Sequence, residues 1–183
     1  MAAAPRRVEL AGSPAGGYRP RRMTDASQIP AAIAERMARS AQGRALRLEL
    51  VRTSPQLVLK VPYKPELVGD PDSGVIAGGV VTTLLDFACG WATALALKEP
   101  TSIATLDLRI DYMRPSRPGL DIHATAHCYK LTRSVAFLRG VAYDEDPDDP
   151  VAAAQAAFML DSNAGRAPGA NLEPPRPRPR KSR

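Results

Sequence analysis

One long apolar segment, residues 75–97, constrains the fold of this chain more than any other feature. Its 23 residues contain a single charged side chain, Asp86, near the midpoint. As a helix the segment would be about 34 Å long, which is enough to cross a bilayer. A carboxylate at the centre of a membrane costs at least about 2.5 kcal/mol, and no second apolar segment accompanies this one. We therefore expect the buried core helix of a soluble domain and no association with a membrane.

The segments on either side of this helix have the apolar–polar alternation of β-strands. Pro30 marks the start of a shorter helix over residues 29–41, and residues 64–74 are expected to be a loop. Predicted strands cover residues 46–50, 57–63, 106–112, 120–131, 134–143 and 151–160. The order of helix, two strands, long helix and four strands predicts an α+β fold in which an antiparallel sheet wraps one long central helix.

Charge divides the chain into one domain and two tails. The net charge is +6 over 183 residues, but segments 1–27 and 165–183 carry +3 and +5, which leaves −2 for residues 28–164. The first segment is expected to be a flexible arm and the last a disordered tail rich in Pro and Arg. The folded part is therefore not expected to bind nucleic acid. Cys89 and Cys128 form no disulfide framework, and without a secretory signal they favour a cytoplasmic location.

Asp86 has two interpretations. A buried carboxylate is unfavourable unless it is paired or hydrogen-bonded, so Asp86 could make a structural bond to a neighbouring helix or to backbone. Alternatively, it is a general base or nucleophile whose pKa is tuned by burial. The absence of any other charge in so long a helix favours the catalytic interpretation.

Gly78 and Gly79 lie close to the expected start of the same helix. Glycine at a helix start lets a ligand oxygen approach bare N–H groups, which together with the helix dipole can hold a developing oxyanion. The pair could equally serve only a tight turn. Asp86 follows Gly78 by eight residues, about 12 Å along a helix, whereas a base and an oxyanion donor must each lie within about 3 Å of their target atoms. If both act, the site lies across a dimer interface, with Gly78 from one chain and Asp86 from the other.

Two motifs in the sequence carry a family resemblance. Gly78-Gly79 is followed after six residues by Asp86, and the strand near residue 112 closes with Tyr112-Met113-Arg114-Pro115. This pattern resembles the hotdog-fold acyl-CoA thioesterases, in particular the phenylacetyl-CoA thioesterase-like group, over residues 30–161. The resemblance implies a dimer with one sheet running through both chains, often assembled further into a tetramer. It also implies hydrolysis of acyl-CoA without a metal or redox cofactor.

The resemblance assigns roles to individual residues. Asp86 matches the catalytic carboxylate, Gly78 matches the residue whose N–H polarises the thioester carbonyl, and Thr105 matches a hydroxyl near the attacking water. The positions expected to contact substrate or CoA are Gly79, Ala77, Arg133 and Ser134. Arg133 is as compatible with a solvated turn as with a contact to the CoA phosphates. The same two interpretations apply to Arg114 and Arg117.

Two departures from the family pattern affect these expectations. Ala77 replaces the histidine that precedes the two glycines in the family, and Pro71 and Asp72 stand where relatives often place an asparagine. The alternative to hydrolysis is therefore a non-catalytic hotdog protein that binds acyl-CoA or an aromatic ligand. A weaker alternative is a scaffold whose basic tails recruit a partner. His123 and His127 have no third ligand in the sequence pattern, so no metal site is expected.

Overall fold

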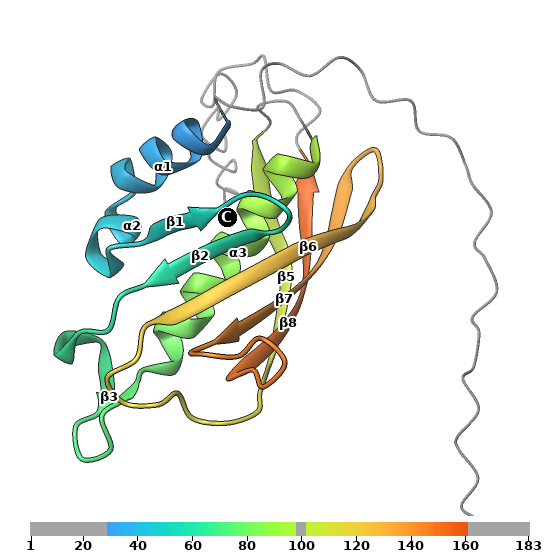
Figure 1. The fold of residues 1–183 in the computed structure, drawn as a ribbon. Coiled ribbons are helices and arrows are strands. Elements are labelled where there is room, and N and C mark those ends of the chain that lie inside the picture. The colour runs from blue at the N-terminus through green and yellow to red at the C-terminus, as the bar shows by residue number, and fades with distance from the viewer. Residues whose placement is uncertain (1–28, 98–101, 161–183) are drawn as a thin grey trace, which may run out of the picture.

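The computed structural model describes residues 29–97 and 102–160, in which one long helix packs against a six-stranded sheet (Figure 1). Two short helices come first, α1 (Ile29–Arg39) and α2 (Ala41–Leu46). The elements that follow are β1 (Glu49–Arg52), β2 (Leu57–Val61), the 3-10 helix η1 (Pro65–Leu67), β3 (Val68–Asp70), β4 (Val75–Ile76), α3 (Gly78–Leu97), β5 (Ile103–Tyr112), β6 (Ile122–Leu131), β7 (Val135–Tyr143) and β8 (Ala152–Leu160). Both predicted tails, 1–27 and 165–183, lie outside the described residues.

The main sheet has the strand order β1-β2-β6-β7-β8-β5, and every neighbouring pair is antiparallel. Burial alternates along β8, whose inward side chains meet the core while their neighbours face outward. The strand β5 forms one edge of the sheet and pairs with β8 along its whole length. This arrangement confirms the predicted α+β architecture.

Helix α3 supplies the core that the sheet wraps. Its buried side chains are Val80, Val81, Leu84, Leu85, Ala88, Cys89, Ala92 and Thr93. Gly140 of β7 allows the helix to approach closely, since an added Cβ there would lie 3.5 Å from Cys89 Sγ and 3.0 Å from the Thr125 carbonyl oxygen. By length and composition alone α3 could cross a membrane, but it lies along the concave side of the sheet (Figure 1).

The structure differs from the sequence prediction where the chain enters the sheet. The helix predicted over 29–41 ends at Arg39, and a second helix, α2, follows it. The Ser40 hydroxyl caps α2 by accepting the Gly43 N–H at 3.1 Å. Arg47 ends α2 in the left-handed region with φ 50°. The strand predicted from residue 46 therefore begins only at Glu49.

A small hairpin replaces part of the predicted loop 64–74. Strand β3 pairs with β4, which uses the first residues of the apolar segment, so α3 begins at Gly78 rather than at residue 75. Gly69 of β3 packs against Ala77, because an added Cβ there would lie 2.8 Å from the Ala77 Cα. The Ala77 N–H donates to the Leu67 carbonyl at 2.9 Å. The hairpin thus supports the chain just before the glycine pair.

A buried ion pair fixes the segment that follows β5. Arg114 donates from both terminal nitrogens to Asp144, at 2.8 and 2.7 Å, and the Asp144 side chain is fully buried. The Arg114 guanidinium lowers the pKa of Asp144 to about 2. Arg114 also pairs with Asp149, and Arg117 pairs with Glu145. Both arginines are therefore held by carboxylates, rather than left free for a phosphate.

Candidate active site

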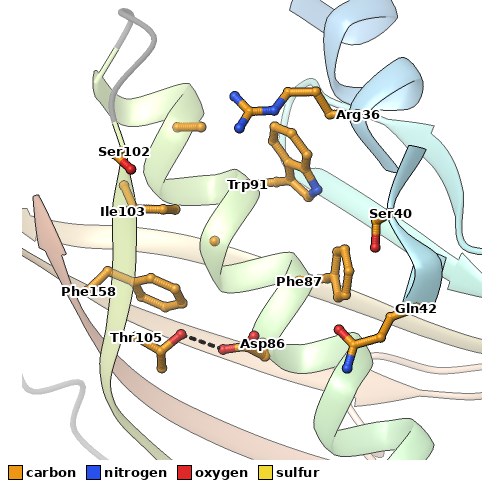
Figure 2. Close-up of a pocket in the computed structure, with 12 residues that line it drawn as sticks. Arg36, Ser40, Gln42, Asp86, Phe87, Trp91, Ser102, Ile103, Thr105 and Phe158 are labelled. Atoms are coloured by element: carbon orange, nitrogen blue, oxygen red, sulfur yellow. Dashed lines mark hydrogen bonds between the residues drawn. The ribbon is translucent and has the colours of Figure 1, made fainter. Parts of the chain in front are cut away.

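Asp86 faces a cavity of about 390 Å³ bounded by α3, the start of β5 and the two N-terminal helices (Figure 2). The residues that line it are Arg36, Ser40, Gln42, Asp86, Phe87, Gly90, Trp91, Ala94, Ser102, Ile103, Thr105 and Phe158. Asp86 is half-buried. Its carboxylate is therefore accessible to a small molecule in the cavity while the helix fixes its position.

The hydroxyl of Thr105 orients this carboxylate. It donates to Asp86 Oδ1 at 2.9 Å, from the edge strand β5 to helix α3 (Figure 2). An ionised carboxylate only accepts hydrogen bonds, so this bond occupies one oxygen and leaves Oδ2 for a water molecule or substrate. An oriented carboxylate on a cavity wall is what a general base requires. Two of the three predicted catalytic residues are thus in direct contact.

Three aromatic side chains lie along the wall beyond Asp86, among polar ones. Phe87 and Trp91 of α3 and Phe158 of β8 line the cavity, and the Arg36 guanidinium lies 5.8 Å from the centroid of the Trp91 ring (Figure 2). Apolar walls with a few placed polar groups are typical of small-molecule sites. The cavity can therefore hold a small organic molecule beside the Asp86 carboxylate.

The sequence prediction does not include this aromatic wall. A signal for the part on α3 was present, because positions 86, 87, 90, 91 and 94 recur at helical spacing and share one face. Arg36 and Phe158 reach the cavity only through the packing of α1 and β8 around α3. Local periodicity carries no information on that packing.

The glycine pair lies at the N-terminus of α3, where Gly78 lines a second cavity, of about 340 Å³. Gly78 and Gly79 are exposed, and in the described part of the chain their N–H groups have no acceptor. The Gly78 carbonyl accepts the Tyr112 hydroxyl at 2.6 Å. Unpaired N–H groups at a helix start are ready donors for a ligand oxygen. The turn therefore has the donors that its predicted role requires.

Within one chain, Asp86 and Gly78 belong to different cavities. The residues that line the two cavities have no member in common. Eight residues of α3, or about 12 Å, separate the carboxylate from the glycine donor. A single chain therefore does not bring both groups to one substrate carbonyl.

The other predicted contact residues lie away from Asp86. Ala77 is half-buried against the β3–β4 hairpin, and Gly79 is exposed beside Gly78. Arg133 and Ser134 belong to the exposed turn between β6 and β7 and line neither cavity. Their contact with CoA stays a prediction.

Cysteine and histidine side chains do not add to this site. Burial, followed by the charge of Asp86, raises the pKa of the Cys89 thiol to about 12, which makes it a poor nucleophile. Burial lowers the pKa of His123, whose ring stacks on Tyr143 at 5.5 Å, while His127 is exposed. Among residues 29–97 and 102–160, no group of three His, Cys, Asp or Glu side chains is placed to hold a metal.

Known sequences identify the family. Residues 73–151 match the model of the thioesterase superfamily. The medium/long-chain acyl-CoA thioesterase YigI of Salmonella typhimurium is 32% identical over 131 residues, which cover 64% of this chain and 83% of that protein. This chain belongs to the thioesterase superfamily. A Halobacterium salinarum protein named as an esterase is 38% identical over 68 residues, and that match spans 36% of this chain and only 45% of the relative.

A solved structure supports the same assignment for this thioesterase. The crystal structure of a Pseudomonas aeruginosa protein is 38% identical, with a TM-score of 0.66, and the match covers 72% of this chain and 98% of that chain. The match and the sheet wrapped on α3 confirm the predicted hotdog fold. The superfamily match at 73–151 includes Gly78, Gly79, Asp86 and Thr105, so both halves of the candidate site lie in the matched region.

Proposed function

We propose that this thioesterase hydrolyses acyl-CoA, the substrate class in the name of its Salmonella typhimurium relative. The observation that carries the proposal is the Asp86–Thr105 pair, an oriented carboxylate in a cavity that also contains Phe87, Trp91 and Phe158. Membership of the superfamily supports thioester chemistry at this carboxylate. The aromatic wall suits the acyl group, and CoA would extend over the surface.

The edge strand β5 suggests how two chains would complete the site. Among the described residues β5 pairs only with β8, so its other edge is free. Thr105, near the start of β5, contacts Asp86, whereas Tyr112, at its end, contacts Gly78. If two copies pair their β5 strands antiparallel about a two-fold axis, the start of one strand lies opposite the end of the other. Asp86 would then lie near the partner subunit's Gly78, in a homodimer.

In this dimer one subunit supplies the base and its partner supplies the oxyanion donor. Asp86 takes a proton from a water molecule while the water oxygen attacks the thioester carbonyl carbon. The carbonyl oxygen gains negative charge, which the N–H of the partner subunit's Gly78 stabilises at the positive end of α3. Collapse of the tetrahedral intermediate breaks the C–S bond, and the sulfur takes the proton back from Asp86. The products are the free acid and CoA.

Ala77, in place of the family's histidine, does not remove the backbone donors. The Ala77 N–H donates to Leu67 and its carbonyl accepts the Val80 N–H, both at 2.9 Å, so the turn is held without an imidazole. The proposal therefore retains hydrolysis despite this departure.

Free-thiol release from short-chain, medium-chain, long-chain and aryl acyl-CoAs tests the proposed function. We expect turnover of at least one class, and the class that reacts fastest identifies the acyl group that the aromatic wall accepts. Binding of acyl-CoA without thiol release from any member of the panel would overturn hydrolysis and favour a binding protein.

Thr105→Val is expected to lower kcat by about tenfold, because valine keeps the branched shape but cannot hold the Asp86 carboxylate in its reactive orientation. Thr105→Ser keeps the hydroxyl and should retain most of the activity. Thr105 is exposed, so the free energy of unfolding should change by less than about 0.5 kcal/mol in either variant. Steady-state kinetics that show equal kcat for Thr105→Val and the wild type would contradict the orienting role.

A further inference from the structure

The Tyr112 hydroxyl completes a short hydrogen-bond chain that ends on the glycine pair. Its oxygen lies 2.6 Å from the Gly78 carbonyl oxygen and 2.9 Å from Thr82 Oγ1. A carbonyl only accepts, so Tyr112 donates its single proton to Gly78, and Thr82 must then donate to Tyr112. The order from Thr82 through Tyr112 to Gly78 is thereby fixed, and each bond polarises the next.

This chain of bonds acts on a defined peptide unit. The Gly78 carbonyl and the Gly79 N–H belong to one planar peptide, so fixing the direction of the oxygen fixes the direction of the N–H. The preceding peptide is held separately, because the Ala77 carbonyl accepts the Val80 N–H at 2.9 Å. That bond sets the direction of the Gly78 N–H. Strand β5 therefore holds the direction of the Gly79 N–H through the hydroxyl of Tyr112.

Both glycines lie in the first turn of α3, and the Tyr112 hydroxyl supports this turn from another element. Glycine has the largest backbone freedom of any residue, and neither Gly78 nor Gly79 has a side chain to hold the turn. Contact with the tyrosine is close, since a Cβ added at Gly78 would lie 3.3 Å from Tyr112 Oη. Within the helix, the Thr83 hydroxyl donates to the Gly79 carbonyl at 2.8 Å. Hydroxyl groups thus restrain the carbonyls of both glycines, while the N–H groups stay free for a ligand.

We propose that Tyr112 is a positioning residue for one oxyanion donor of this thioesterase, the Gly79 N–H. By holding the Gly78 carbonyl, it aims the Gly79 N–H at the thioester oxygen, so that Gly79 acts as a second donor beside Gly78. The inference rests on the proposed function and adds to it that β5 orients both parts of the site. Thr105 at one end of the strand orients the carboxylate, and Tyr112 at the other end orients the Gly79 N–H.

Tyr112→Phe is the variant that tests this role, because it removes only the hydroxyl. We expect kcat for acyl-CoA hydrolysis to fall about tenfold with KM changed by less than about twofold, since the donors act mainly on charge that develops in the transition state. Thr82→Val should lower kcat less, because it removes only the bond that polarises Tyr112. Tyr129→Phe is the matched control, because Tyr129 is an exposed tyrosine on β6 that packs beside Phe137, and its kcat should equal that of the wild type.

A spectroscopic readout separates positioning from a general structural effect. The Asp86→Asn protein should hold a thioester labelled with ¹³C at the carbonyl without hydrolysing it, and aimed N–H donors lower the stretching frequency of that carbonyl. Adding Tyr112→Phe should move the infrared band to higher frequency, whereas adding Tyr129→Phe should leave it in place. An unchanged band, or an unchanged kcat in Tyr112→Phe, would overturn the proposal. If the wild type releases no thiol, the proposed function fails, but the band of a bound thioester still decides the positioning role.

Discussion

Replacing Asp86 with asparagine is expected to lower kcat for thioester hydrolysis by at least about a thousandfold, within the range that a general base contributes. Asparagine has nearly the same shape and can still accept the Thr105 hydroxyl through its amide oxygen. It can neither take a proton from water nor attack the carbonyl as a nucleophile. The expected variant therefore binds acyl-CoA and does not turn it over.

Two controls accompany this variant. Asp148→Asn changes an exposed carboxylate in the turn after β7 and should keep the wild-type kcat. The free energy of unfolding of Asp86→Asn should stay within about 1 kcal/mol of the wild type, because no ion pair among residues 29–97 and 102–160 involves Asp86. Full thiol release from a folded Asp86→Asn protein would remove the carboxylate from the mechanism.

The largest expected effect on stability comes from Asp144→Asn. The Asp144 side chain is fully buried and holds both terminal nitrogens of Arg114, so the variant leaves a largely buried cation without its main partner. Removing one partner of such a pair lowers the free energy of unfolding by about 3 kcal/mol. Denaturant titration of both proteins at pH 7 measures this loss. Glu35→Gln is the control, because the Glu35–Arg39 pair is exposed and should contribute less than about 0.5 kcal/mol. Equal losses in the two variants would contradict this account.

The same pair predicts how stability depends on pH. The pKa of Asp144 falls from 3.8 to about 2 on folding, so the unfolded state binds the proton more readily. The contribution of the ionised group is therefore complete above about pH 5, is lost as the pH falls from about 4 to about 2, and amounts to about 2 kcal/mol. The difference in unfolding free energy between the wild type and Asp144→Asn should shrink over that interval. A difference that stays constant from pH 6 to pH 2 would show that the charge of Asp144 does not stabilise the fold.

Periodicity and spacing were sufficient to predict the central part of this structure. The apolar segment around Asp86 has one charge, and the alternation after it places four strands correctly within a few residues. The eight-residue separation of Gly78 and Asp86 predicted that one helix cannot bring both to one substrate, and the two separate cavities agree. These features depend on local geometry, which a sequence pattern records directly.

Features that depend on long-range packing were not predictable. Leu46, Leu48 and Leu50 alternate as in a strand, but two local features, the Ser40 cap and the left-handed Arg47, place Leu46 at the end of α2 instead, so the periodicity was misread there without any long-range cause. The partners in the Asp144–Arg114 pair are 30 residues apart in the sequence. The contact between Tyr112 and Gly78 spans 34 residues and requires β5 to lie at the edge of the sheet beside α3.

A heterodimer tests the central claim, that each site takes its carboxylate and its glycine donor from different chains. Asp86→Asn removes the carboxylate. Gly78→Pro disables the donor side, because it removes the N–H at the first helical position, where proline fits helical φ, and its Cβ crowds Tyr112 Oη at 3.3 Å. Each variant alone should be nearly inactive. Two differently tagged chains, co-expressed and purified through both tags, would form a dimer in which one site carries both mutations and the other carries neither. The account predicts about half of the wild-type kcat per dimer for this species. A heterodimer as inactive as its two parents would show that carboxylate and donor act within one chain, and would contradict the account.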